Sequence, residues 1–259
     1  MNSMPESVLL VTSLTPRNIE NQQRAVESWL RLGFSVVSLN ARADIDVLGP
    51  RFRGVEFVEI QQGAQAACDE SPVALDHVVD FLGSREMPVC GLIKPEIHLR
   101  ATSATLRFLM EETKGALVYA SHADVEALDD TTGEIRKSGF DIFLFDRELL
   151  KRIPSTEFRL GRSWWDLWLP FYLMRSSQGC PLKFVSFPFA SRLAIAENGA
   201  EDAGYEKYGM LLAKFMDQGA YDALLAQSPE TRRRSLEAMN LNVTMAVLFE
   251  SRWLSCFPE

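Results

Sequence analysis

The fold is decided at residues 8–14, which read VLLVTSL. A short, continuously apolar run that ends at a break, here Pro16, is typical of a buried parallel strand. Residues 19–32 follow with apolar side chains at helical spacing, and Gly33 gives that helix its stop. The chain therefore opens with a strand and an amphipathic helix that covers a sheet.

The alternation of strand and helix continues along the chain. Further short apolar runs predict strands at 34–39, 55–60, 89–93, 116–121, 140–145 and 182–187. Helical periodicity predicts helices at 73–82, 102–112 and 164–174, and a mostly helical region at 205–253. This order predicts an α/β fold, with a Rossmann-type mixed sheet flanked by helices and a helical C-terminal region.

The length and composition fit one large domain. The chain has 259 residues, of which 47% are hydrophobic and 24% are charged, as is typical of a folded α/β protein. The sequence contains no internal repeat, low-complexity tract or obvious linker. We expect residues 1–200 to form the sheet domain, and residues 201–259 to form a helical extension packed on the same domain.

Charge and cysteine content narrow the classes of partner. The 27 basic and 35 acidic residues leave a formal net charge of −8, which disfavours binding to nucleic acid or anionic lipid. The four cysteines match no zinc motif and no disulfide framework, so we expect reduced thiols. No apolar run approaches the ~18 residues that span a bilayer. Since a basic leader is also absent, we expect a cytoplasmic protein without a transmembrane segment.

Polar side chains follow the ends of the first two predicted strands, where open α/β sheets bind ligands. Thr12, Ser13 and Leu14 close the first strand, and their hydroxyls and backbone amides could contact a nucleotide. Helix capping is the alternative role for this segment. Asn40 follows the second strand and could bind a ribose or a base, although any α/β protein needs polar loops there.

The predicted strand at 89–93 is followed by Lys94-Pro95-Glu96. An acid at this point could bind a divalent cation, Mn²⁺ or Mg²⁺, that bridges to a diphosphate and offsets the charge of the leaving group. Glu96 would be the oxygen ligand, and His98 lies on the same side of an extended segment. One acid is fewer than a cation site usually has, and Pro95 could simply mark a turn.

Residues 161–168, which read GRSWWDLW, place one carboxylate among three tryptophans. Asp166 would be partly desolvated there and could act as a general base for an acceptor hydroxyl. Trp164 and Trp165 could stack on a sugar ring of the acceptor. The alternative is a core stripe of tryptophans, in which Asp166 caps the helix or pairs with an arginine.

Other classes of site lack their motifs. The sequence has no glycine-rich phosphate loop and no G-x-S-x-G elbow, which disfavours kinase-like, dinucleotide-binding and serine-hydrolase functions. The three histidines, His77, His98 and His122, are too few and too dispersed to predict a metal centre.

Five short segments occur in a characteristic order between residues 8 and 190. They are Thr12-Ser13, the glutamine-rich first helix with Ser28-Trp29, Gly91-Leu92-Ile93, Gly139-Phe140-Asp141-Ile142-Phe143 and Trp164-Trp165-Asp166. In this order they resemble bacterial GT-A-type glycosyltransferase-like proteins. The resemblance implies a GT-A-like nucleotide-diphospho-sugar fold, with donor contacts at the first strand end and a metal contact at the acid after Ile93. It also implies acceptor or base roles near Asp141 and Asp166.

The sequence departs from that family pattern at two places. The pattern's Asn-x-Asp is Lys94-Pro95-Glu96 here, so the longer carboxylate could still reach the metal, or Lys94 could neutralise a diphosphate directly. After the last strand the pattern leads to a metal-binding histidine, but this chain has Phe189-Ala190-Ser191-Arg192. Arg192 could bind donor phosphate bidentately without a metal.

The leading hypothesis is a glycosyltransferase that moves a sugar from a nucleotide-diphosphate donor to a hydroxyl of a glycan or lipid-linked acceptor, in bacterial surface polysaccharide biosynthesis. Asp166 would be the base of an inverting single displacement. The main alternative is a degenerate GT-A-fold module that binds a nucleotide, a glycan or a protein partner without chemistry. A nucleotidyltransferase ranks last, because residues 15–18, TPRN, lack the glycines of its basic loop.

Overall fold

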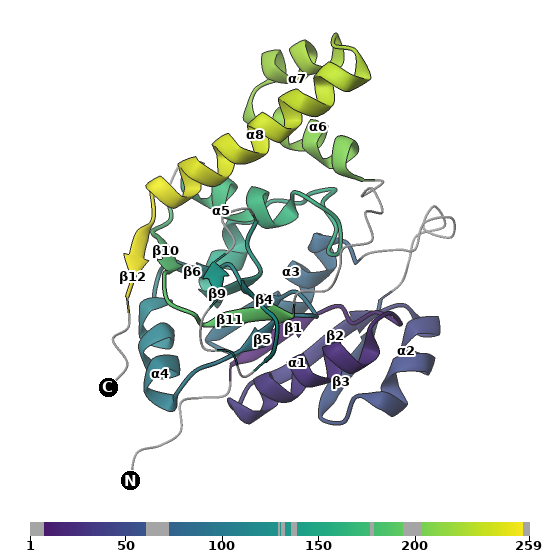
Figure 1. Cartoon of the computed structure of the whole chain (residues 1–259), viewed down its shortest axis with the longest axis vertical. Coiled ribbons are helices and arrows are strands. Elements are labelled where there is room, and N and C mark those ends of the chain that lie inside the picture. The colour runs from purple at the N-terminus through teal and green to yellow at the C-terminus, as the bar shows by residue number, and fades with distance from the viewer. Residues whose placement is uncertain are drawn as a thin grey trace.

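The predicted first strand lies inside the main sheet (Figure 1). The computed structural model describes residues 8–60, 73–128, 130, 133–135, 139–176, 179–193 and 204–255. In it, β1 (Leu9–Thr12) pairs in parallel with β2 (Ser35–Asn40) on one side and with β4 (Val89–Ile93) on the other. All residues of β1 are buried, as expected for a parallel strand covered on both faces.

The main sheet has the strand order β12-β10-β6-β9-β4-β1-β2-β3. Its other strands are β3 (Val55–Glu59), β6 (Leu117–Ala120), β9 (Ile142–Asp146), β10 (Leu182–Val185) and β12 (Arg252–Leu254). Neighbours pair in parallel except around β9, which runs antiparallel to both β4 and β6. The sheet is therefore mixed, as predicted, and the carboxyl ends of its parallel strands meet the start of β9 at one edge.

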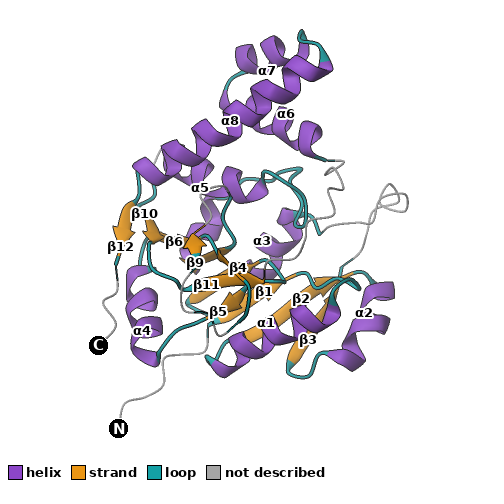
Figure 2. Cartoon of the chain, viewed as in Figure 1, coloured by secondary structure: helices purple, strands orange, loops and turns teal. Residues whose placement is uncertain are grey.

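Helices flank the sheet and dominate the C-terminal region (Figure 2). They are α1 (Ile19–Arg31), α2 (Arg42–Leu48), α3 (Leu75–Gly83), α4 (Ser103–Glu112), α5 (Trp165–Arg175), α6 (Tyr205–Met216), α7 (Gln218–Leu225) and α8 (Pro229–Phe249), with short 3-10 helices η1 (Gly49–Arg51) and η3 (Arg147–Arg152). The predicted fold class is confirmed. None of the described helices is long and apolar enough to cross a membrane.

A second, four-stranded sheet was not expected from the sequence. Its order is β5-β11-β7-β8, formed by β5 (His98–Leu99), β7 (Ala123–Val125), β8 (Glu134–Ile135) and β11 (Ala190–Leu193). Three of these strands follow within a few residues of the ends of β4, β6 and β10. These strands have two to four residues with polar residues among them and form no continuous apolar run, so only pairing in the folded chain defines them.

The main sheet separates two hydrophobic cores. Leu9 and Val11 face the core that includes residues of α3, α5 and α8, whereas Val8 and Leu10 face the core that includes residues of α1 and α4. Successive residues of a strand point to opposite faces, so a continuous apolar run is needed to fill both cores. This is the physical reason that residues 8–14 predict the fold.

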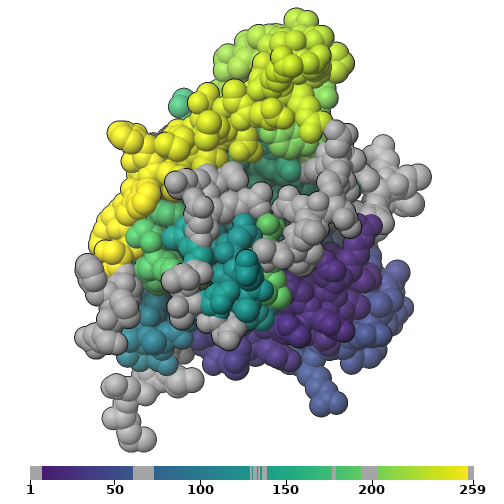
Figure 3. All heavy atoms as spheres, in the orientation of Figure 1, coloured from purple at the N-terminus to yellow at the C-terminus, as the bar shows by residue number. Residues whose placement is uncertain are grey.

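The C-terminal region contributes to the same sheet. After α6, α7 and α8, residues of β12 pair in parallel with β10, and α8 packs against α5. Residues of α8 form a ridge on the face shown in Figure 3. Leu241, Met245 and Phe249 recur every four residues on α8 and are exposed, with Phe249 86% exposed.

Gly91 lies in β4, opposite Leu10 of β1 and Leu144 of β9. A Cβ atom at this position would lie 2.6 Å from Leu10 Cδ1, 2.9 Å from Leu144 Cδ2 and 3.3 Å from Phe143 O. Both leucines are buried in the core and cannot move freely aside. The side chains of these two leucines therefore leave no room for a Cβ atom at position 91.

We expect Gly91→Ala to lower the free energy of unfolding by about 1–3 kcal/mol, because the added methyl overpacks the core. Urea denaturation of the purified variant measures this. Gly83→Ala is the matched control, since a Cβ there has nothing within 4 Å. A transition midpoint for Gly91→Ala equal to that of the unmodified protein would contradict the packing argument.

His98 is a buried titratable residue in β5. It is 4% exposed, and its Nε2 lies 3.0 Å from Asn21 Oδ1 of α1. Burial, together with the charges of Arg24, Arg100 and Arg31, lowers the pKa of His98 from 6.5 to about 4. The unfolded chain therefore binds this proton more readily than the folded chain, so stability is full above pH 6.5 and is lost as the pH falls toward 4.

Through His98 alone, acidification across this range is expected to remove on the order of 3 kcal/mol of unfolding free energy. His98→Gln should lack this part of the pH dependence, because glutamine does not titrate and can still donate to Asn21. Chemical denaturation of both proteins at pH 7 and pH 4.5 isolates the effect from that of the carboxylates. An equal loss of stability in the two proteins would rule it out.

Candidate active site at the carboxyl edge of the main sheet

Three predicted site residues come together at the carboxyl edge of the main sheet. Lys94 directly follows β4, Asp141 directly precedes β9, and Asp166 lies in the first turn of α5. Because β9 runs antiparallel to β4, its start lies beside the end of β4. The topology brings Lys94 into contact with residues that are 47 and 72 positions away in the sequence.

The ammonium of Lys94 joins the two carboxylates. Its Nζ lies 2.9 Å from Asp141 Oδ1 and 2.8 Å from Asp166 Oδ2. The side chains of Asp141 and Asp166 are 4% and 10% exposed, and that of Lys94 is 25% exposed. Lys94 N also donates to Asp141 O at 3.0 Å, which fixes the backbone next to the ion pairs. The Lys94 cluster, defined by these three side chains, carries two negative charges and one positive charge.

The charges in the Lys94 cluster stabilise one another against burial. Burial alone would lower the pKa of Lys94, but Asp141 and Asp166 outweigh it and raise that pKa above its usual value. Burial would likewise raise the pKa of Asp141, but Lys94 and His122 outweigh it and hold that pKa well below its usual range. Lys94 and Asp141 are therefore charged at neutral pH.

Asp166 is held in one position by three donors from three segments. Its Oδ1 accepts from Leu167 N at 3.1 Å, and its Oδ2 accepts from Phe140 N at 3.3 Å in addition to Lys94. The positive end of α5 also favours a carboxylate in the first turn. Gly139 leaves room for this contact, because a Cβ there would lie 2.9 Å from Asp166 Oδ2, and its φ of +79° suits glycine.

The two tryptophans before Asp166 are core residues. Trp164 and Trp165 are 1% and 2% exposed. Trp164 Nε1 donates to Tyr205 O at 2.8 Å, which holds this residue at an unusual φ of +81° where α5 begins. The ring of Trp165 lies 5.9 Å from Lys94 Nζ, a cation–π contact. These contacts explain the burial of both rings, and acceptor stacking by them stays a prediction.

His122 and Asp124 extend the Lys94 cluster toward the surface. Asp141 Oδ2 accepts from His122 N at 2.9 Å and lies 2.6 Å from His122 Nδ1. His122 Nε2 lies 3.3 Å from Asp124 Oδ1 without hydrogen-bond geometry, and Arg192 Nε lies 3.4 Å from the same oxygen. The predicted residue Arg192 is thus connected to Asp141 through two residues that the sequence did not single out.

A clear sequence signal for His122 exists. It follows the end of β6, as Lys94 follows the end of β4, so it belongs to the same class of position at the carboxyl edge. The sequence analysis missed this position because the three histidines are dispersed along the chain. Separation in the sequence says little about distance across a sheet. Asp124 has a weaker signal, since it lies in a strand of three residues within an acidic segment.

The loop after β1 is fixed by a hydrogen-bonded network. Asn40 Nδ2 donates to Leu14 O at 2.7 Å, and Asn40 Oδ1 accepts from Ser38 Oγ at 2.5 Å. Leu14 N in turn donates to Ser38 Oγ at 2.9 Å. Asn40 is buried and both of its side-chain polar atoms are engaged, so its observed role is to hold the loop. Contact between Asn40 and a nucleotide stays a prediction.

Thr12 and Ser13 lie at the end of β1, as predicted. Thr12 Oγ1 is buried and has no hydrogen-bond partner among the described residues. On the far side of the loop, Gln22 of α1 accepts from Thr15 N at 2.9 Å and donates to Thr15 O at 2.9 Å. Hydrogen bonds therefore fix the conformation of the loop after β1. Contacts of this loop with a nucleotide stay a prediction.

The expected cation ligand, Glu96, makes no contact of this kind with the Lys94 cluster. It lies in the turn between β4 and β5, and no hydrogen bond or ion pair of its side chain is found within the described residues. The described residues also contain no group of three or more His, Cys, Asp or Glu side chains that could hold a metal ion. The oxygens of Asp141 and Asp166, which are the best-placed acids, already contact Lys94. The place between these two acids is therefore occupied by the ammonium of Lys94.

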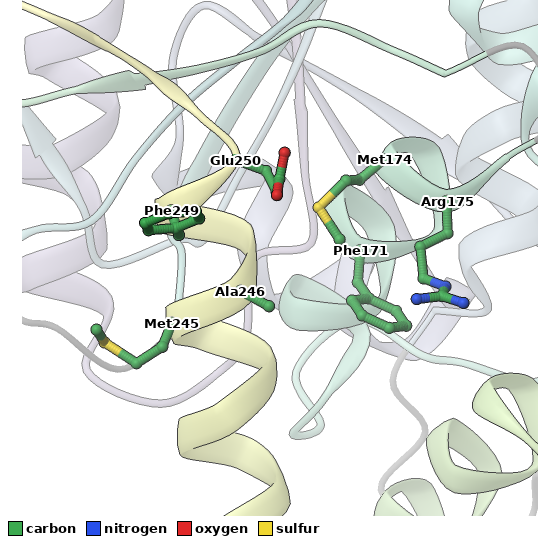
Figure 4. Close-up of a pocket in the computed structure, with 7 residues that line it drawn as sticks. All are labelled: Phe171, Met174, Arg175, Met245, Ala246, Phe249 and Glu250. Atoms are coloured by element: carbon green, nitrogen blue, oxygen red, sulfur yellow. The ribbon is translucent and has the colours of Figure 1, made fainter.

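An apolar groove lies away from this site, between α5 and α8 (Figure 4). It measures about 460 Å³ and is lined by Phe171, Met174, Arg175, Met245, Ala246, Phe249 and Glu250. None of these residues takes part in the Lys94 cluster. The buried charged side chains therefore converge at the carboxyl edge and not in this groove.

We expect Lys94→Met to lower the free energy of unfolding by about 3–5 kcal/mol, because it leaves two buried carboxylates without their counter-ion. Lys151→Met is the matched control, since Lys151 pairs with Glu148 on the exposed surface and should contribute little to stability. Urea denaturation at pH 7 measures both. Equal effects of the two substitutions would show that the Lys94 ion pairs are not energetically special.

No family model matches the sequence, and no curated protein matches it. Among solved structures, the chain is similar to the mannosyltransferase PcManGT of Pyrobaculum calidifontis in complex with GDP-Man and Mn²⁺, at 14% identity and a TM-score of 0.44, over 93% of this chain and 74% of that one. It is similar to S. aureus TarS in complex with UDP-GlcNAc at 11% identity and a TM-score of 0.46, over 93% of this chain and 73% of that one. It is also similar to a putative glucose-1-phosphate thymidylyltransferase from Bacillus anthracis, at 13% identity and a TM-score of 0.41, over 69% and 86%. Similarity this low assigns neither a reaction nor a site residue.

Proposed function

We propose that this chain is a nucleotide-sugar-dependent glycosyltransferase whose reacting centre lies at Asp166, beside Lys94 and Asp141. The observation that carries the proposal is a buried carboxylate, Asp166, held by three donors at the carboxyl edge of a mixed α/β sheet. Ligands of open α/β sheets bind at this edge. The order of short motifs from Thr12 to Asp166 supports the same class of enzyme.

Asp166 is the proposed general base. It would accept the proton of an acceptor hydroxyl while the hydroxyl oxygen attacks the anomeric carbon and the nucleoside diphosphate leaves, which inverts the configuration. Lys94 would position Asp166, and His122 would position Asp141. The proposed acceptor is a glycan or lipid-linked hydroxyl in the cytoplasmic assembly of a bacterial surface polysaccharide.

The loop after β1 is the proposed donor contact. It lies at the carboxyl edge, and its conformation is held by hydrogen bonds of its backbone to Ser38, Asn40 and Gln22. A preformed loop reduces the entropy lost on binding, so it suits recognition of a nucleotide. Arg192, at the outer end of the charge network, is the proposed contact for donor phosphate.

A binding module without chemistry is the second candidate, and one observation favours it. Lys94 contacts both carboxylates of the Lys94 cluster, so neither acid is free of a cation in this structure. An acid whose oxygen already contacts an ammonium offers less room for the hydroxyl of an acceptor. Such a module would bind a nucleotide, a glycan or a protein partner at the same edge.

A thermal-shift screen against UDP-, GDP-, CMP- and dTDP-linked sugars tests the donor site. A ligand that binds only the folded state raises the melting temperature by mass action. We expect one nucleotide class to stabilise the protein. Failure of every nucleotide to do so would overturn the proposed donor site.

For the stabilising donor, we expect Asp166→Asn to reduce transfer or donor hydrolysis by a factor on the order of 10² to 10⁴, because the general base is lost. Donor affinity should stay within about threefold, since the base contacts the acceptor side. Asp222→Asn, an exposed site on α7, is the matched control. Full activity in Asp166→Asn would remove Asp166 from the mechanism, and no turnover in the unmodified protein despite donor binding would favour the binding module.

A further inference from the structure

We propose that the ammonium of Lys94 is a built-in replacement for a divalent cation between Asp141 and Asp166, so that this centre binds no divalent metal and acts without one. The meaning of this for sugar transfer rests on the proposed function. The claim about metal binding does not, because it concerns only how these three side chains use their charges.

Each oxygen of the two carboxylates has a donor within this chain. Lys94 Nζ lies 2.9 Å from Asp141 Oδ1 and 2.8 Å from Asp166 Oδ2. The other oxygen of Asp141 accepts from His122, and the other oxygen of Asp166 accepts from Leu167 N. All four oxygens therefore accept from donors of this chain, and a cation at this place would have to displace Lys94 to bind them.

The positive charge of Lys94 also opposes the binding of a divalent cation. A divalent cation between the two carboxylates would take the place of the ammonium and would be repelled by it at short range in a poorly solvated site. The backbone of Lys94 is fixed at the end of β4, with its amide donating to Asp141 O. The ammonium can leave the carboxylates only by turning toward solvent on a side chain that is 25% exposed.

Glu96, the remaining predicted cation ligand, takes no part in the Lys94 cluster. Glu96 is two residues beyond Lys94 and makes no hydrogen bond or ion pair within the described part of the chain. Asp141 and Asp166 are the acids that contact Lys94 Nζ, and two carboxylates can hold Mg²⁺ or a similar cation when water or phosphate completes its ligands. Removal of Lys94 should therefore matter, because it would leave these two carboxylates directed at the place that the ammonium now occupies.

The test measures Mn²⁺ binding directly, by loss of the free-ion signal in electron paramagnetic resonance and by thermal shift, with no nucleotide present. We expect no binding at this centre in the unmodified protein. Lys94→Ala should bind one Mn²⁺, and saturating Mn²⁺ should raise its melting temperature by about 5 °C or more. The double variant Lys94→Ala/Asp141→Asn should lose at least about tenfold in Mn²⁺ affinity relative to Lys94→Ala, because one ligand is gone.

Lys183→Ala is the matched control, since Lys183 is similarly buried but contacts a single carboxylate, that of Glu112, at 2.7 Å. It should gain no Mn²⁺ site. Mn²⁺ binding by the unmodified protein that disappears in Asp141→Asn would overturn the proposal, and this arm does not depend on the folding of any Lys94 variant. A folded Lys94→Ala that binds no Mn²⁺ would overturn it as well.

These outcomes are separable from those of the proposed function. Absence of nucleotide binding in the unmodified protein would remove the glycosyltransferase but would leave the Mn²⁺ results unchanged. Conversely, a metal site in the unmodified protein would leave the donor site intact and would show only that Lys94 does not replace a cation.

Discussion

The contact of one ammonium with two buried carboxylates is the constraint on which the carboxyl edge depends. Lys94 belongs to the end of β4, Asp141 to the start of β9 and Asp166 to the start of α5, so their ion pairs tie three elements together. In a poorly solvated place, two acids without a cation would repel each other and force these elements apart. The elements can pack closely because the charge is compensated where they meet.

The reversed direction of β9 makes this contact possible. In a purely parallel sheet, the residue before a strand lies at the opposite edge from the residue after its neighbour. Because β9 is antiparallel to β4 and β6, Asp141 lies next to both Lys94 and His122. The mixed topology therefore shapes the chemistry of the site, since it brings residues from the beginning of one strand and the ends of two others to one place.

The parts of the fold that fill both cores could be predicted from the sequence, and the parts defined by pairing alone could not. β1 and β4 are runs of apolar residues that serve two faces, and the predicted strand at 89–93 has the observed bounds. β5, β7, β8 and β11 have two to four residues and leave no pattern. In the site, Lys94, Asp141 and Asp166 were predicted as separate residues. Their mutual contact was not, because the direction in which a long side chain points is decided by what surrounds it.

The orientation of Lys94 changes which part of the site can bind a diphosphate. The sequence allowed Lys94 to neutralise phosphate directly, but in the structure its charge is directed inward, and the Lys94 cluster keeps a net negative charge. A diphosphate is repelled by such a centre. Along the network the sign changes again at Arg192, which lies beyond Asp124 and on a different strand. If the chain binds a nucleotide sugar, electrostatics therefore favours a position with the phosphates near Arg192 and the sugar between the phosphates and Asp166. In that position the protein's own charges keep the base and the leaving group apart.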